Sequence, residues 1–139
     1  MGKIGTMNKL NRKGILGFTM IELMIVLIIV AILLALAYPS YIQYVRKSKR
    51  GEAQQLLMNW SVNQEIWRSN NPQYATLLQL PAPTNDNYAF DIDDRSATTY
   101  TLIADASGDQ ENDAAKDGTS CDVLTLDQNG VKLEAVCWE

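Results

Sequence analysis

The sequence predicts an α+β protein in which one long amino-terminal helix carries a small antiparallel β-sheet. Two observations predict this fold class. An apolar run without a charged residue extends from Leu23 to Val45 of the 139-residue chain, and short stretches of alternating polar and apolar residues follow residue 87. A long apolar run predicts a helix and alternation predicts half-buried strands. The chain therefore divides into an apolar segment and a polar head.

The apolar segment has the length of one membrane span. Phe18 to Tyr38 is 21 residues, or about 31 Å as a helix, which matches the hydrocarbon core of a bilayer. A secretory signal places its cleavage site after the apolar region, whereas here the basic region ends first, at "RKGILG". A cut at Gly17 would remove only a leader of residues 1–17, or a shorter one if Met7 is the start. Basic residues flank the span on both sides, so their charges do not orient it: Lys3, Lys9, Arg12 and Lys13 precede it, and Arg46, Lys47, Lys49 and Arg50 follow it.

The helix is predicted to continue beyond the span. Pro39 follows directly and predicts a kink, because proline removes one backbone hydrogen bond. "SNNP" at 69–72 predicts the end, which gives one helix from Phe18 to Asn71. Trp60 and Trp67 are the expected core anchors of an apolar face with three- and four-residue spacing. Its members are Ala53, Leu56, Leu57, Trp60 and Trp67.

The head is predicted to contain up to four strands. "YAFDID" at 88–93 and "TTYTLIAD" at 98–105 alternate, and the acidic, turn-rich stretch 105–120 is typical of a loop. "DVLTLDQNGVKLEAVCW" predicts two strands joined by the turn residues Asn129-Gly130, a strong hairpin signal. A two-residue turn would pair Asp127 with Lys132, and further along it would pair Leu126 with Leu133 and Leu124 with Ala135.

The two cysteines, Cys121 and Cys137, both lie in the head. An even number beyond a membrane segment favours one disulfide in an oxidising compartment, and two buried free thiols are the alternative. The hairpin register places the two residues on opposite faces of the sheet. A disulfide would therefore require the hairpin to break or bulge near Cys121.

The charge of the head argues against nucleic acid as a partner. After residue 50 there are fifteen acidic and four basic residues, and such a surface repels phosphates. "RKSKR" places Arg46, Lys49 and Arg50 on one helical face, where contact with lipid headgroups is the first interpretation. The chain has no histidine, and no catalytic constellation or phosphate loop appears. We therefore expect neither an enzyme nor a cofactor.

Alternate side-chain oxygens in the acidic stretch resemble a calcium loop. Gln110 stands where such a loop needs glycine, however, and Lys116 stands where it needs a bidentate glutamate. A solvated acidic loop without a metal is the favoured interpretation. The oxygens belong to Asp105, Ser107, Asp109, Glu111 and Asp113.

The stretch "KGILGFTMIELMIVLIIVAILLALAYPSY" resembles the amino-terminal signature of type IV pilins, the class III signal sequence. The resemblance covers roughly residues 12–45. It implies cleavage between Gly17 and Phe18 by a prepilin peptidase, followed by methylation of the new Phe18 amine. It also implies that Glu22 recruits the subunit into a filament by pairing with the terminal amine of a neighbouring subunit. The local alternative is that Glu22 interacts only with the dipole of its own helix.

The tail "CDVLTLDQNG…CW" resembles that of PilE-like minor pilins, which implies a disulfide between Cys121 and Cys137. The resemblance implies a structural pilus subunit of a Gram-negative bacterium, with a leader at 1–17, an assembly helix at 18–50 and a head at 51–139. Such a subunit is single-pass in the inner membrane before it joins a surface pilus, where it serves adhesion, twitching motility or DNA uptake. Its partners would be other pilins, the processing enzyme and the inner-membrane assembly platform.

Two alternative functions stay open. A pseudopilin of a type II secretion system carries the same amino-terminal signature, although the paired cysteines near the end favour a pilus. A DNA-receptor pilin would use a basic head, and the acidic head of this chain opposes that function.

Overall fold

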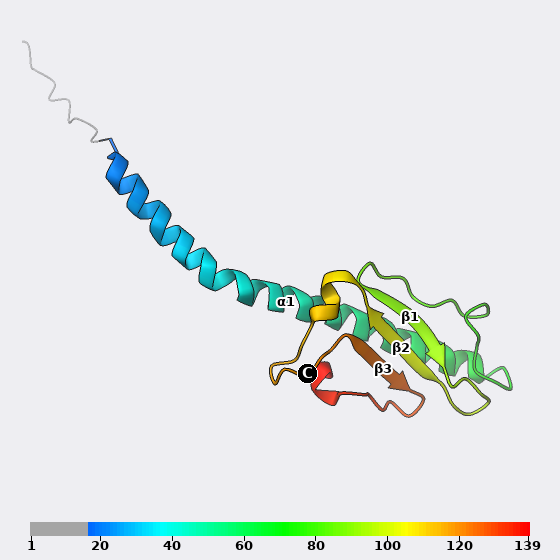
Figure 1. The fold of residues 1–139 in the computed structure, drawn as a ribbon. Helices are drawn as coiled ribbons and strands as arrows, with labels where there is room; N and C mark the ends of the chain where they lie inside the picture. Colours follow the sequence, from blue (N-terminus) through cyan, green and yellow to red (C-terminus); the bar gives the residue numbers. More distant parts are fainter. Residues whose placement is uncertain (1–16) are drawn as a thin grey trace, which may run out of the picture. The chain divides into compact units, whose positions relative to one another are not determined.

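The computed structural model describes residues 17–139, so the predicted leader before Gly17 and the alternative start at Met7 lie outside the described residues. The chain divides after Ala37 into an amino-terminal unit and a head unit of residues 38–139. Helix α1 (Met20–Arg68) is followed by three strands, β1 (Tyr88–Asp93), β2 (Thr101–Ala106) and β3 (Val123–Asp127) (Figure 1). Two short 3-10 helices complete the fold, η1 (Gly108–Asn112) and η2 (Ala135–Trp138). The predicted α+β fold class is confirmed.

Side chains at both ends of α1 set its bounds. The Glu22 N–H donates to Thr19 Oγ1 at 3.2 Å, so Thr19 caps the helix and α1 begins at Met20 rather than at the predicted Phe18. At the other end Ser69 Oγ donates to the Ile66 carbonyl at 2.7 Å, and Asn71 Nδ2 donates to the Trp67 carbonyl at 2.8 Å. These bonds satisfy carbonyls of the last turn, and α1 ends at Arg68 rather than at Asn71. The helix continues through Pro39, and the kink stays a prediction.

The three strands form one antiparallel sheet in the order β1-β2-β3. Its buried face stacks Phe90 beside Ala104 and Leu124, and Ile92 beside Leu102 and Leu126. Within the head unit these side chains form a core with one face of α1, to which Ala53, Leu57 and Trp60 contribute. This core positions the helix residues just before it, where the charged groups described below lie.

The predicted fourth strand is wrong. The Asp127 side chain accepts hydrogen bonds from the Asn129 and Val131 N–H groups, at 2.8 and 2.7 Å. After this turn the chain makes a single bridge, between Leu126 and Lys132, which is one residue out of the predicted register. The remaining residues form η2 instead of a strand, because a regular hairpin would keep the cysteines on opposite faces.

The disulfide joins Cys121 and Cys137, with 5.6 Å between their Cα atoms, and both residues are buried. Free thiols are therefore excluded for this pair, and the predicted break in the hairpin is confirmed. The two tryptophans differ from one another. Trp60 is 3% exposed and lies in the core as predicted, whereas Trp67 is partly exposed and lines a surface groove with Gln73 and Gln79.

Candidate functional site

The bond between Gly17 and Phe18 lies in an accessible segment. Residues 17–19 precede α1 and have no regular structure. The Phe18 side chain is 84% exposed, and a Cβ at Gly17 would have no atom within 4 Å. Proteases need an extended, accessible backbone, so the predicted cleavage position is open to an enzyme.

Glu22 lies in the first turn of α1 and is exposed. It is the only charged residue between positions 17 and 45. Its backbone is held by the Thr19 cap, while its side chain borders a shallow groove with Gly17 and Phe18. The predicted cleavage bond and the predicted assembly carboxylate thus border the same groove, and Glu22 also occupies the position that suits its own helix dipole.

The apolar surface that follows Glu22 has no partner within the described residues of the chain. A stretch of α1 is long and apolar enough to cross a membrane, and none of it is buried. Exposed apolar side chains point to all sides of this part of the helix, and an uncovered surface of this extent is characteristic of lipid or protein contact. They include Leu23, Ile25, Leu27, Ile29, Ile32 and Leu34.

Two arginines of the predicted basic face are engaged by the acidic stretch. Arg50 Nη1 donates to Asp113 Oδ2 at 2.8 Å, and both side chains are buried, at 5% and 2% exposure. Arg46 Nη2 donates to Asp109 Oδ1 at 2.8 Å, at the surface. Burial raises the pKa of the Asp113 carboxyl against the opposing attraction of Arg50, and the hydrogen bond from Arg46 lowers the pKa of Asp109.

A buried glutamine completes the contact between this stretch and α1. Gln110 Nε2 donates to the Arg46 carbonyl and to the Tyr88 hydroxyl oxygen, each at 3.0 Å. Burial raises the pKa of Tyr88 to about 12. Asp109 and Asp113, two residues of the calcium-like spacing, face arginines rather than one another. Within residues 17–139 no group of three or more metal-ligating side chains comes together.

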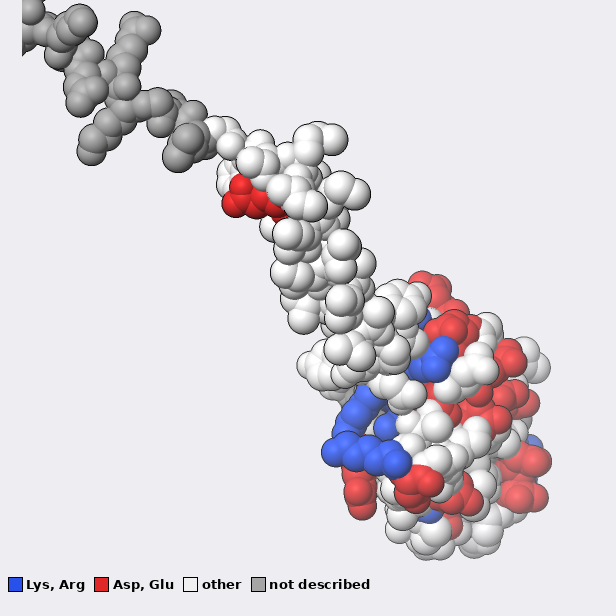
Figure 2. All heavy atoms as spheres, turned by 60° about the vertical axis from the view of Figure 1, so that its left-hand side comes forward, with Lys and Arg blue, Asp and Glu red and all other residues white. Residues whose placement is uncertain are grey.

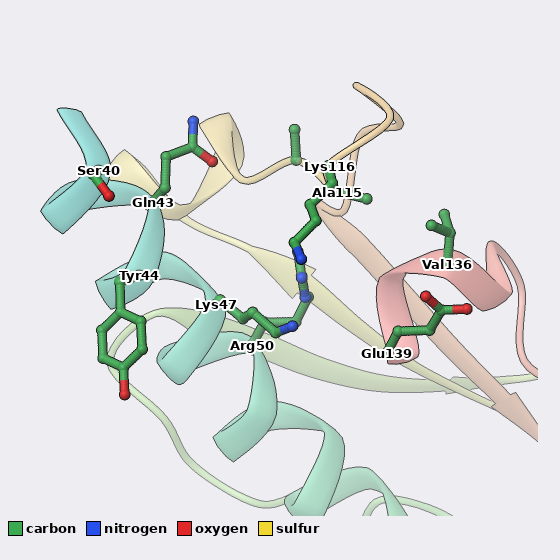
Figure 3. A pocket seen from close by; sticks show the side chains of 10 residues that line it. Ser40, Gln43, Tyr44, Lys47, Arg50, Ala115, Lys116, Val136 and Glu139 are labelled. Carbon is green, nitrogen blue, oxygen red and sulfur yellow. The ribbon is translucent and has the colours of Figure 1, made fainter.

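The prediction that Arg46, Lys49 and Arg50 contact lipid headgroups from one helical face is therefore wrong for Arg50, which is buried and paired with Asp113. Around this part of α1 the cations without a partner among the described residues are lysines. Lys47 and Lys116 line a pocket of about 310 Å³ together with Tyr44 and Arg50 (Figure 3). Figure 2 shows Lys and Arg gathered mainly in one zone of the visible head surface, while Asp and Glu spread over the rest. Sequence reasoning missed Lys116, since no local pattern connects it to Lys47.

Comparisons with known proteins identify a family for the head, a motif for the amino-terminal segment and a similar fold. A family model described as "Type IV minor pilin ComP, DNA uptake sequence receptor" matches residues 39–125, and one described as "Prokaryotic N-terminal methylation motif" matches residues 12–38. The fold is similar to a solved type IV pilin from Shewanella oneidensis, with a TM-score of 0.54 and 24% identity over 68% of this chain and 98% of that chain. No curated protein gives a significant match.

The methylation motif covers the residues that carry the signature, and the pilin model covers most of the chain. The resemblance to minor pilins is thereby confirmed, and so is the expected role as a structural pilus subunit. The chain belongs to the type IV minor pilin ComP family.

Proposed function

We propose that this chain is a minor pilin that is stored as a single-pass protein of the inner membrane and then built into a surface pilus. One observation carries the proposal. The amino-terminal part of α1 is apolar and unburied, it contains the single carboxylate Glu22, and it follows directly on the accessible Gly17–Phe18 bond. An exposed apolar surface of this extent is unfavourable in a chain that remains alone in water, and lipid or neighbouring subunits would cover it.

The physical chemistry suggests how the two features act together. An unpaired carboxylate costs a few kcal/mol in a hydrocarbon environment, and an ammonium group in the same low dielectric offsets that cost. Cleavage before Phe18 creates such an ammonium group on every subunit. We propose that Glu22 of an incoming subunit pairs with the Phe18 amine of its neighbour, which favours one stagger between helices, while apolar packing replaces lipid contact.

The test is quantitative mass spectrometry on filaments sheared from the host and on its membranes. In the wild type we expect a peptide that begins with methylated Phe18 in both fractions, at a low molar ratio to the most abundant pilin. Glu22→Gln is expected to leave cleavage intact and to remove the chain from filaments. Gly17→Val is expected to block cleavage. Glu52→Gln, which changes an exposed acid of the same helix, serves as the matched control.

Three results would contradict parts of this proposal. Normal filament incorporation of Glu22→Gln would exclude the proposed pairing. A dominant molar ratio would make the chain the main fibre subunit. If the chain is processed but absent from wild-type filaments, the result would favour a role in a secretion pseudopilus over a role in a surface pilus.

DNA binding is a second candidate function, which the description of the matching family favours. DNA phosphates would contact Lys47, Lys49 and Lys116, because most of the other charged residues of the head are acidic. Three phosphate contacts predict a salt dependence with a slope of about −2.7 in log K against log salt. Fluorescence anisotropy with the mature chain and labelled duplex DNA measures this slope. Loss of binding in Lys47→Gln/Lys116→Gln, with Lys132→Gln as control, would support the candidate, whereas equal binding by all variants would exclude this site.

A further inference from the structure

We propose that the pocket between α1 and η2 binds the headgroup of a zwitterionic aminophospholipid while the protein is in the membrane. Lys47 and Lys116 would hold the phosphate, and the Glu139 carboxylate would hold the ammonium group. All three residues line the same pocket. This inference depends on the membrane stage of the proposed function and adds a ligand to it.

The first step is that the two lysines of the pocket have no acidic partner among the described residues. Within residues 17–139, Lys47 and Lys116 form no ion pair, although the head has fifteen acidic residues. Two unpaired ammonium groups at one pocket favour an anionic group from outside the chain. Most other basic side chains in the described part of the head are engaged by carboxylates, by backbone carbonyls or by an aromatic ring. They are Arg46, Arg50, Arg68, Arg95 and Lys132.

The second step is the charge balance of the pocket. Arg50 also lines it, but its guanidinium is paired with the buried Asp113. Glu139 adds a carboxylate from the opposite wall, at the end of η2 (Figure 3). A simple anion would therefore meet attraction on one side and repulsion on the other, whereas a phosphate joined to an ammonium group matches both sides.

The third step is the position of the pocket along the chain. Ser40, Gln43 and Tyr44 line it, and they follow directly on the apolar span. Tyr38, Tyr41 and Tyr44 are all exposed, and tyrosines are enriched where a helix meets the headgroup layer. Lysine stems are long enough to place their ammonium groups at that layer. A lipid headgroup is therefore favoured over DNA as the source of the phosphate.

The test uses the full mature chain in nanodiscs that contain equal amounts of phosphatidylethanolamine and phosphatidylglycerol, with retained lipid identified by native mass spectrometry. We expect the wild type to retain phosphatidylethanolamine preferentially. Lys47→Gln/Lys116→Gln is expected to lower retention by about a hundredfold, since it removes two ionic contacts that are each worth about tenfold. Glu139→Gln is expected to shift the preference toward phosphatidylglycerol, and Lys132→Gln is the control.

The outcomes separate this inference from the proposed function. A chain that does not enter nanodiscs contradicts both. A chain that inserts but shows equal retention in all variants, or a preference that Glu139→Gln leaves unchanged, overturns the inference alone. Displacement of the lipid by duplex DNA at equal phosphate concentration would assign the pocket to nucleic acid instead.

Discussion

Replacing Arg50 with methionine is expected to destabilise the head far more than replacing Arg46. Both arginines lie on α1, and both contact an aspartate of the same acidic stretch at 2.8 Å. They differ in burial. The Arg50 and Asp113 side chains are 5% and 2% exposed, whereas Asp109 is 66% exposed. The two substitutions therefore compare a buried ion pair with a surface one, although Arg46 binds both carboxylate oxygens of Asp109 and Arg50 binds only one of Asp113.

The expected loss of unfolding free energy depends on whether the aspartate left behind is buried or in water. At 2.8 Å and an effective dielectric constant of about 20, two unit charges attract by about 6 kcal/mol. Desolvation of both ions offsets most of this attraction, so the intact pair adds little net stability. Arg50→Met removes the attraction and leaves Asp113 buried and unpaired, which costs about 3–5 kcal/mol. Arg46→Met leaves Asp109 in water, and we expect little change.

Urea unfolding of the mature chain, with the disulfide intact, measures both effects. The double variant Arg50→Met/Asp113→Ala should lose less stability than Arg50→Met alone, because no buried charge is left behind. Burial raises the pKa of Asp113, so a proton neutralises it more readily in the folded state. The deficit of Arg50→Met should accordingly shrink as the pH falls toward about 4. Equal losses in Arg46→Met and Arg50→Met would refute this reasoning.

Three further predictions concern the core of the head. Trp60→Ala should cost about 3–5 kcal/mol in urea unfolding and Trp67→Ala much less; similar losses would mean that Trp67 is also a core residue. Reduction of the Cys121–Cys137 disulfide, which spans 16 positions, should cost about 3 kcal/mol, and an unchanged melting temperature with reductant would contradict this. Burial raises the pKa of Tyr88 to about 12. The contribution of the neutral Tyr88 hydroxyl to the free energy of unfolding is therefore complete below about pH 10 and is lost as the pH rises through about 12. Tyr88→Phe should lose less stability than the wild type as the pH rises from about 10 to 12, and an equal loss in both proteins would contradict this assignment to Tyr88.

Features encoded by neighbouring residues could be predicted from the sequence. The apolar span and strand β1 at 88–93 depend on local pattern, and the structure places β1 at those residues. Strand β2 begins at Thr101, three residues later than predicted. Ser96 explains the delay, because its hydroxyl oxygen accepts hydrogen bonds from the Thr98 and Thr99 N–H groups and holds them in a turn.

Features that depend on contacts distant in sequence could not be predicted in this way. Helical spacing places Arg46, Lys49 and Arg50 on one face, but only the packed loop decides that Arg50 is buried. The pocket that joins Lys47 to Lys116 likewise exists only once the acidic stretch has folded against α1. Of the candidate sites, sequence reasoning therefore named the predicted processing and assembly residues, whose roles stay predictions, and it missed the pocket.

The two parts of α1 differ in a way that fits both the proposed membrane stage and a folded head. Residues after position 50 bury one face against the sheet, through Ala53, Leu57 and Trp60. None of the described residues before Tyr38 is buried. Because the head completes its core without the apolar part of α1, the exchange of lipid for neighbouring helices that we propose would leave the head folded. The proposed assembly would then change the surroundings of the first part of the helix without refolding the second.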